Sequence, residues 1–186
     1  MKFIKTAMSA VALLATLSAQ AIEYNQLLPE KSSVAFTYQQ MGVKMDGRFR
    51  KFTAQLAFDP ARVAAAKASF EVDLAGIDTG ASESDQEVAG KTWFDTKAFP
   101  TARFVTTAIK PAGGNRYDVS GQLSIKGKTQ ALTFPATFTA QGKAAVFEGA
   151  FTLRRADFSI GEGSWAKFDI VANDVLVKFS IAATGK

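Results

Sequence analysis

The chain has 186 residues and contains neither cysteine nor histidine. This double absence excludes disulfides, thiolate zinc sites, cysteine nucleophiles, His-ligated metals and a Ser-His-Asp triad. Charged residues make up 21% of the chain, and the formal net charge of +5 is too mild to indicate a nucleic-acid partner. The length suits one domain. We therefore expect a binding or carrier protein without a metal or cofactor, and not an enzyme.

The first 21 residues have the pattern of a secretory signal peptide. Lys2 and Lys5 precede an apolar run at 7–17, and Ala19-Gln20-Ala21 supplies a small-x-small cleavage pattern. The run is too short to cross a bilayer, which needs about 20 residues. We expect cleavage after Ala21, export of the protein and a mature domain of residues 22–186. Loss of the two lysines lowers the net charge from +5 to +3.

Apolar and polar side chains alternate along most of the mature chain, which is typical of β-strands. The alternating runs lie at residues 34–38, 52–58, 70–74, 104–108, 119–125, 132–138, 147–153 and 175–181. Turns at 113–115, 126–127 and 141–142 contain glycine, which accepts the positive φ that tight hairpins need. The pattern predicts an all-β fold, favouring a single eight-stranded antiparallel barrel over a sandwich.

Two segments break the alternation and favour short helices. Residues 60–67 follow Asp59, a plausible N-cap, and begin with a proline. Residues 82–92 begin with serines that can cap a helix, followed by acidic residues in the first turns and a lysine late, as the helix dipole favours. We therefore expect one or two short helices beside the strands.

The interior of an eight-stranded barrel is either filled by side chains or able to hold one small ligand. In most runs the phenylalanines fall on one parity, so they converge on one interior. Core packing alone would also account for them, and parity does not tell which face lines a cavity. The residues expected to contact an apolar ligand are Phe36, Leu56, Phe70, Val72, Phe104, Leu123, Phe134, Phe138, Phe147, Phe151, Val177 and Phe179. Trp93 joins this set, because it follows the second helical segment and can pack that helix over one end as a lid; it can equally serve as a plug at that end of the barrel.

The charged clusters have a functional and a simpler interpretation. Paired carboxylates can perform acid/base hydrolysis, but near a helix start they are more simply a solvated surface. The candidates for this chemistry are Asp78, Glu83, Asp85, Glu87 and Asp95. Basic residues can meet a phosphate or an anionic membrane, but they too more often face water. These residues are Arg48, Arg50, Lys51, Arg154 and Arg155.

Four stretches follow one another over nearly the whole mature chain. They are Phe36-x-x-x-Gln40-Met41-Gly42-Val43, Asp78-Thr79 through Trp93-Phe94-Asp95 to Phe99-Pro100, Val119-x-Gly121-x-Leu123-x-Ile125-Lys126-Gly127, and Arg155-x-Asp157-Phe158-x-Ile160-Gly161. As an ordered set they resemble the YceI-like family of exported lipid-binding proteins. The resemblance implies a lipocalin-like barrel around a long apolar cavity that holds a polyisoprenoid, such as a polyprenyl quinone or a polyprenyl phosphate, in the bacterial periplasm.

The chain departs from that family's pattern at polar positions. Gln40 stands where the family usually carries histidine, and Ser84-Asp85-Gln86-Glu87-Val88 replaces an Arg-Asp-x-His-Leu pattern. If those family residues meet a lipid headgroup, its recognition is altered or lost here. The apolar features are kept, so binding of the lipid chain is the safer inference.

The sequence therefore predicts a non-enzymatic periplasmic carrier that encloses a polyisoprenoid or similar apolar lipid. Two alternatives stay open, a carboxylate-based periplasmic hydrolase and an eight-stranded outer-membrane barrel. No nucleic-acid partner is expected. Transient contact with a membrane and a homodimer also stay open as interactions of the protein.

Overall fold

Within residues 22–185, the part of the chain that the computed structural model describes, eleven antiparallel β-strands form one sheet. The predicted signal peptide lies outside these residues. The strands are β1 (Tyr24–Leu27), β2 (Ser33–Gln40), β3 (Val43–Phe49), β4 (Phe52–Ala57), β5 (Lys67–Asp73), β6 (Ile77–Asp78), β7 (Thr101–Pro111), β8 (Arg116–Ile125), β9 (Lys128–Gln141), β10 (Ala144–Arg154) and β11 (Asp174–Gly185). Their spatial order is β4-β5-β7-β8-β9-β10-β11-β2-β3-β6, and β1 pairs with the end of β11.

The predicted all-β class is confirmed, but the sheet has eleven strands in residues 22–185 where eight were expected. All eight alternating runs are strands, and β1, β3 and β6 were missed. β6 has two residues and β1 has four, too few to show a period. β3, with the sequence VKMDGRF, is mostly exposed and carries polar side chains among its apolar ones. Short or solvated strands give no clear alternation, so the count from the sequence was low.

Tight hairpins join consecutive strands where the sequence provides residues with positive φ. Between β8 and β9, Lys126 and Gly127 have φ values of 48° and 73° while Ile125 pairs with Lys128. Between β2 and β3, Met41 and Gly42 have φ values of 51° and 80°. Two-residue turns with positive φ at both positions match the twist of antiparallel strands. They therefore fix the register of both hairpins.

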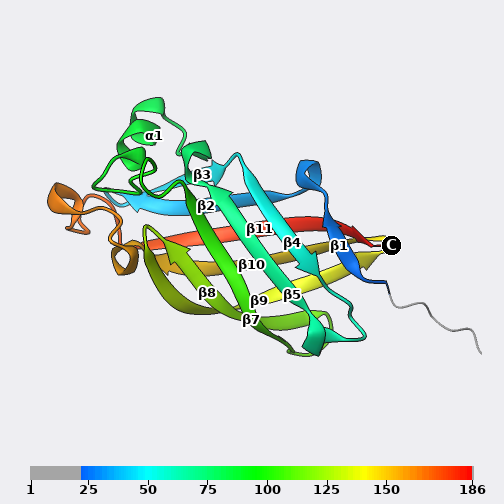
Figure 1. Ribbon diagram of the computed structural model, residues 1–186. Coiled ribbons are helices and arrows are strands. Elements are labelled where there is room, and N and C mark those ends of the chain that lie inside the picture. The colour runs from blue at the N-terminus through cyan, green and yellow to red at the C-terminus, as the bar shows by residue number, and fades with distance from the viewer. Residues whose placement is uncertain (1–21, 186) are drawn as a thin grey trace, which may run out of the picture.

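The sheet curls on itself, and its two ends differ (Figure 1). At one end lie β1 and the end of β11, where Tyr24 of β1 and Phe58 after β4 exchange two backbone hydrogen bonds of 2.8 and 3.1 Å. At the other end lie the helix α1 (Ser82–Ala89) and the loop that follows β10, drawn in orange. The first end is thus closed by backbone pairing. The second is covered by the helix, the segment that follows it and the loop.

Inward-facing glycines make room for phenylalanine rings in the curl. Gly47 on β3 lies opposite Phe36 on β2, and a Cβ on Gly47 would overlap the Phe36 ring. Gly149 on β10 lies opposite Phe179 on β11, and a Cβ there would lie 2.5 Å from the ring tip. A ring that lies over a glycine on the neighbouring strand fills the space left by the missing side chain.

The two predicted helical segments have different outcomes. The segment expected to be helical at residues 82–92 contains α1, which ends at Ala89, three residues earlier than expected. Residues 60–67 form only a 3-10 turn at Val63–Ala65, because β5 begins at Lys67. Asp59 does accept a hydrogen bond from the backbone N–H of Ala61 at 2.8 Å, as a capping residue would. No helix in residues 22–185 has the length and apolar character needed to cross a membrane.

Aromatic side chains fill the closed end of the sheet. The ring of Phe58 lies 4.9 Å from that of Phe138, 5.1 Å from that of Phe147 and 5.3 Å from that of Tyr117. Tyr24 packs edge-on against Phe138 at 5.3 Å. We call these five residues the aromatic plug. Aromatic pairs at such separations contribute about 0.5–1.5 kcal/mol beyond their buried area.

Candidate ligand-binding cavity

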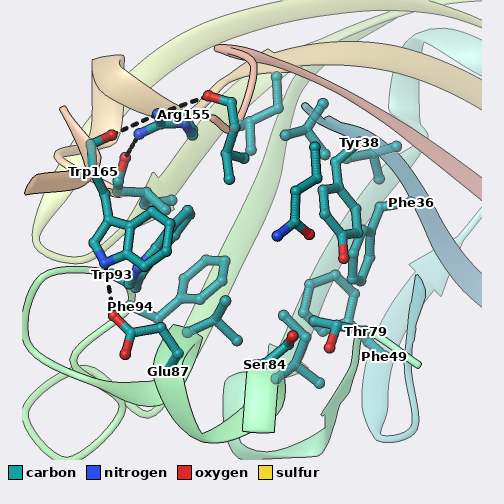
Figure 2. Close-up of a pocket in the computed structure, with 18 of the residues that line it drawn as sticks. Phe36, Tyr38, Phe49, Thr79, Ser84, Glu87, Trp93, Phe94, Arg155 and Trp165 are labelled. Carbon is teal, nitrogen blue, oxygen red and sulfur yellow. Dashed lines mark hydrogen bonds between the residues drawn. The ribbon is translucent and has the colours of Figure 1, made fainter. Parts of the chain in front are cut away.

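An apolar cavity of about 280 Å³ opens at the end of the sheet that carries α1. Its wall comes from β2, β3, β10, β11, α1 and the loop of residues 155–173, which we call the mouth loop. We call this space the outer cavity. It is lined by Phe36, Tyr38, Gln40, Phe49, Ile77, Thr79, Glu83, Ser84, Glu87, Val88, Trp93, Phe94, Leu153, Arg155, Ile160, Trp165, Val171, Val175 and Val177. Figure 2 shows Tyr38 and Phe36 on one side of it and Arg155 and Trp165 on the other.

Arg155 holds the mouth loop in its shape. Its side chain is only 2% exposed, and its guanidinium donates six hydrogen bonds of 2.7–3.1 Å to backbone carbonyls. The accepting carbonyls belong to Ile160, Gly161, Trp165, Lys167, Val171 and Ala172. Burial lowers the pKa of Arg155 below its ordinary value, but a guanidinium stays charged in proteins. The prediction of a solvated basic face is therefore wrong for Arg155, whose donors are used to order a loop.

Lys126, in the β8–β9 turn, ties the mouth loop to the segment after α1. Its ammonium donates hydrogen bonds of 2.8 Å to the carbonyls of Lys91 and Ser159 and to the carboxylate of Glu162. The hydrogen bond and charge of Lys126 hold the pKa of Glu162 below its ordinary value. One buried lysine stem thus joins a hairpin, the helix connection and the mouth loop.

Two tryptophans join α1 to the mouth loop. The indole nitrogen of Trp165 donates a hydrogen bond of 2.8 Å to Oε1 of Glu87 on α1 (Figure 2). The rings of Trp93 and Trp165 lie 5.4 Å apart, and the Arg155 guanidinium lies 5.3 Å from the Trp93 ring. Trp93 therefore packs at the covered end, as a lid residue would. Its Nε1 is buried without a hydrogen-bond partner in the described part of the chain.

The start of α1 is fastened by Asp85. Its Oδ1 accepts hydrogen bonds of 2.7 Å from both the backbone N–H and the hydroxyl of Thr79. On the opposite wall, burial and the Asp85 carboxylate raise the pKa of the Tyr38 phenol above its ordinary value. Tyr38 is therefore neutral at ordinary pH and can both donate and accept a hydrogen bond.

Two smaller cavities continue the space toward the closed end. The middle cavity, of about 130 Å³, shares Phe49, Phe94, Leu153 and Val177 with the outer one. The inner cavity, of about 50 Å³, is lined by residues that include Leu56 and Phe147. The side chains shared by the middle and inner cavities are Phe70, Phe104, Phe134 and Phe179. Three adjacent cavities thus run from the mouth toward the aromatic plug, separated mainly by apolar side chains.

The structure places most of the predicted ligand-facing residues along this series. Phe36 and Trp93 line the outer cavity, and Val177 lines the outer and middle ones. The middle or inner cavity is lined by Leu56, Phe70, Val72, Phe104, Leu123, Phe134, Phe147, Phe151 and Phe179. Phe138 is the exception, because its ring packs inside the aromatic plug against Phe58 and Phe147. Phe138 points into the interior, as the alternation predicts, but it lies at the end that the aromatic plug fills. Contact of any of these residues with a ligand stays a prediction.

Several lining residues were missed by the sequence prediction. Tyr38 has the parity of Phe36 on the same strand, so the alternation could have included it. Ile160, Val171 and the backbone around Arg155 come from the mouth loop, which has no period to read. The contact that places them is the buried guanidinium of Arg155. Nothing in the local sequence shows that this arginine is buried.

Several of the charged candidates make structural contacts. Asp78 forms ion pairs with Arg48 and Arg50 at 3.0 and 3.1 Å, and these pairs with the Gly80 N–H hold the pKa of Asp78 below its ordinary value. Asp85 and Glu87 are engaged as described above. Among residues 22–185, no cluster of acidic side chains has a geometry that could hold a metal ion.

Comparison with known proteins identifies the chain. The model of the YceI-like domain matches residues 26–183. The chain belongs to the YceI-like family. A UPF0312 protein of Pseudomonas savastanoi is 32% identical over 169 residues, which cover 84% of this chain and 88% of that protein. A UPF0312 protein of Pseudomonas putida strain W619 is 35% identical over 120 residues, and that match spans 62% of the relative.

Solved structures of other proteins share the fold. BcnA of Burkholderia cenocepacia superposes with a TM-score of 0.83 at 43% identity, covering 86% of this chain and all of that one. A polyisoprenoid binding domain from Saccharophagus degradans superposes with a TM-score of 0.68 at 16% identity, covering 89% of this chain and 99% of that one. The second likeness shows the fold alone. In this YceI-like chain, Gln40, Ser84 and Glu87, which depart from the family's expected His and Arg, all line the outer cavity.

Proposed function

We propose that this YceI-like protein is a non-enzymatic carrier that encloses a long apolar lipid, a polyisoprenoid, inside a lipocalin-like curled sheet. The observation that carries the proposal is the series of three adjacent apolar cavities leading inward from one mouth. A narrow series of this kind suits a linear chain better than a compact molecule. The neighbour from Saccharophagus degradans, described as a polyisoprenoid binding domain, supports the same ligand class.

Apolar enclosure is sufficient to hold such a ligand. Each buried CH₂ contributes about 0.8 kcal/mol, so several isoprene units supply a large favourable free energy without any catalytic group. The side chains shared by neighbouring cavities include Phe49, Phe94 and Phe104. Rotation of rings about their side-chain torsions would join the three spaces into one tunnel. The bound chain would then displace these rings from the positions they now occupy.

The two alternatives lack a supporting observation. A hydrolase would need carboxylates free to act, whereas Asp78, Asp85 and Glu87 are engaged in structural contacts. An outer-membrane barrel presents its apolar band outward, whereas the phenylalanines here line the interior cavities. Enclosure of a lipid uses the apolar interior as it stands.

We propose that the protein acts in the periplasm and takes its ligand from a membrane surface. Four large apolar side chains beside the mouth are exposed: Met41 by 75%, Val43 by 60%, Phe168 by 49% and Ile170 by 41%. The Met41 N–H donates to the Ile170 carbonyl at 2.7 Å, which joins the β2–β3 turn to the mouth loop. We call these four residues the apolar lip.

The position of the apolar lip supports membrane contact. Gln40 and Val171, which line the outer cavity, form an isolated β-bridge directly beside the lip. Lys44 and Lys167 are exposed next to lip residues in the sequence, and lysines near apolar side chains suit an anionic lipid surface. A lipid that leaves the bilayer at the lip would enter the cavity with little exposure of its chain to water.

The proposal is tested by purifying the protein from the periplasm, extracting it with organic solvent and identifying the extract by mass spectrometry. Native mass spectrometry of the intact protein gives the stoichiometry. We expect one isoprenoid lipid per protein. A bare protein that also shows no saturable change in Trp fluorescence on titration with a polyprenyl quinone would overturn the carrier function.

A further inference from the structure

The polar rim of the outer cavity has a chemistry that separates two classes of lipid headgroup. We propose that this rim selects lipids with an uncharged polar end, an alcohol or a quinone, and disfavours those with a phosphate end. The inference rests on the proposed lipid-binding function and deepens it. It follows from the charges that line the mouth and from the hydrogen bonds that those groups already make.

Carboxylates outnumber cations at the mouth. Among the residues that line the outer cavity, Glu83 and Glu87 are acidic and Arg155 is basic. Glu83 and Asp85 also lie in the first turn of α1. The helix N-terminus would otherwise attract an anion, but these carboxylates already compensate its partial positive charge. A phosphate monoester carries a charge of about −1.5 to −2 at neutral pH, so it would enter against like charge.

The basic side chain in the lining offers no free donor. All the N–H groups of Arg155 are directed at the six backbone carbonyls of the mouth loop, within residues 22–185. A phosphate would have to take hydrogen bonds away from these carbonyls, which would then be left buried and unpaired. Each such carbonyl costs about 1–3 kcal/mol. Arg155 therefore stabilises the loop and is not a phosphate clamp of the usual bidentate kind.

Lys44 and Lys167 lie on the outer side of the apolar lip and do not line the cavity, and three cations closer to it are already engaged. Lys126 is bonded to Glu162 and to two carbonyls, and Arg48 and Arg50 are paired with Asp78. In contrast, Tyr38, Gln40 and Ser84 line the cavity, and their side chains make no hydrogen bond within the described residues. A hydroxyl, an amide and a phenol can form hydrogen bonds with an uncharged headgroup, but they supply no positive charge to balance an anionic one. The unengaged groups thus suit an alcohol or a quinone.

The experiment compares two ligands with the same chain, geranylgeraniol and geranylgeranyl phosphate. Binding of each to the lipid-free protein is measured by Trp fluorescence titration at neutral pH. We expect the alcohol to bind at least about tenfold more tightly, which corresponds to about 1.4 kcal/mol. The double variant Glu83→Gln with Glu87→Gln keeps the polar shape and removes both charges. Its preference should fall to about threefold or less, through tighter binding of the phosphate.

A matched control uses a carboxylate outside the three apolar cavities. Glu148 lies on β10 opposite Ser180 and lines a separate surface groove with Arg116 and Lys178, so Glu148→Gln should keep the full preference for the alcohol. Wild-type protein that binds the phosphate as tightly as the alcohol would overturn the headgroup inference and leave the carrier function standing. Failure of both ligands to bind at micromolar concentration, together with a bare protein on extraction, would overturn both proposals.

Discussion

The indole N–H of Trp165 donates a hydrogen bond of 2.8 Å to the Glu87 carboxylate, and this contact links the mouth loop to α1. The two residues are 78 positions apart in the sequence. The loop is also bonded to the end of β2 through the Gln40–Val171 bridge, and both elements border the outer cavity. The contact is therefore suited to act as a latch on α1: its breakage would free the helix itself, while the Lys126 hydrogen bonds and the Thr92 carbonyl would still hold the loop to the segment after the helix.

The latch predicts a specific effect on ligand exchange. Trp165→Phe removes the donor, and a hydrogen bond of this kind contributes about 0.5–1.5 kcal/mol. We expect ligand release to become about three- to tenfold faster, measured by transfer of a fluorescent isoprenoid to acceptor vesicles. Trp93→Phe is the matched control. It makes the same change from indole to phenyl, but the Nε1 that it removes makes no hydrogen bond in the described chain. Equal rates in both variants would contradict the latch.

Among the charged residues of the mouth, Arg155 should be the one whose substitution lowers the free energy of unfolding most. Arg155→Lys replaces six donated hydrogen bonds by at most three and leaves buried carbonyls unpaired. We expect the free energy of unfolding to fall by about 2–5 kcal/mol in urea denaturation. The neighbouring Arg154 is exposed, so Arg154→Lys should stay within about 0.5 kcal/mol of the wild type. A loss below 1 kcal/mol for Arg155→Lys would contradict the role assigned to it.

The Lys126–Glu162 contact predicts looser packing of the mouth loop in acid. Lys126 lowers the pKa of Glu162 from its ordinary 4.5. A carboxyl whose pKa is lowered by folding stabilises the folded state above its unfolded pKa and loses that contribution as pH falls through the folded pKa. We therefore expect amide exchange at residues 159–166 to gain protection above about pH 4.5 and to lose it below. In Glu162→Gln this pH dependence should disappear, and its persistence would assign the effect to another group.

Alternation along the strands predicted the all-β fold and the inward face of most runs, because period two directly reports one buried face. It failed where that link between period and burial is absent. Val43 to Phe49 form a strand with an exposed surface, and Phe138 faces a filled end instead of a cavity. The mouth loop is set by Arg155, whose partners are backbone carbonyls. Backbone acceptors have no sequence signature, so neither the loop nor the role of Arg155 could be predicted.

The junction between the outer and middle cavities predicts a dependence on chain length. Val177 lines both spaces, so Val177→Phe places a ring in the path of a long chain. We expect a long-chain polyprenol to bind at least about tenfold more weakly, a loss of about 1.4 kcal/mol, while farnesol, which fits the outer cavity, loses less than threefold. Val105→Phe adds the same ring outside the three cavities and is the matched control. Equal losses for both chain lengths would argue against a continuous path.

The apolar lip predicts that collection of the lipid depends on contact with the bilayer. Met41→Ser with Phe168→Ser removes two exposed apolar side chains beside the mouth and leaves the residues that line the cavities unchanged. We expect uptake of a polyprenyl quinone from anionic vesicles to become about tenfold slower, because each fully buried apolar side chain contributes about 1.5–3 kcal/mol to insertion. Affinity for the same quinone added in detergent-free solution should change less than twofold. Leu176→Ser is the matched control. It removes an exposed apolar side chain that lies on β11, outside the lip, and should leave uptake unchanged. Unaltered uptake in the lip variant would show that the lipid enters the cavity without this surface.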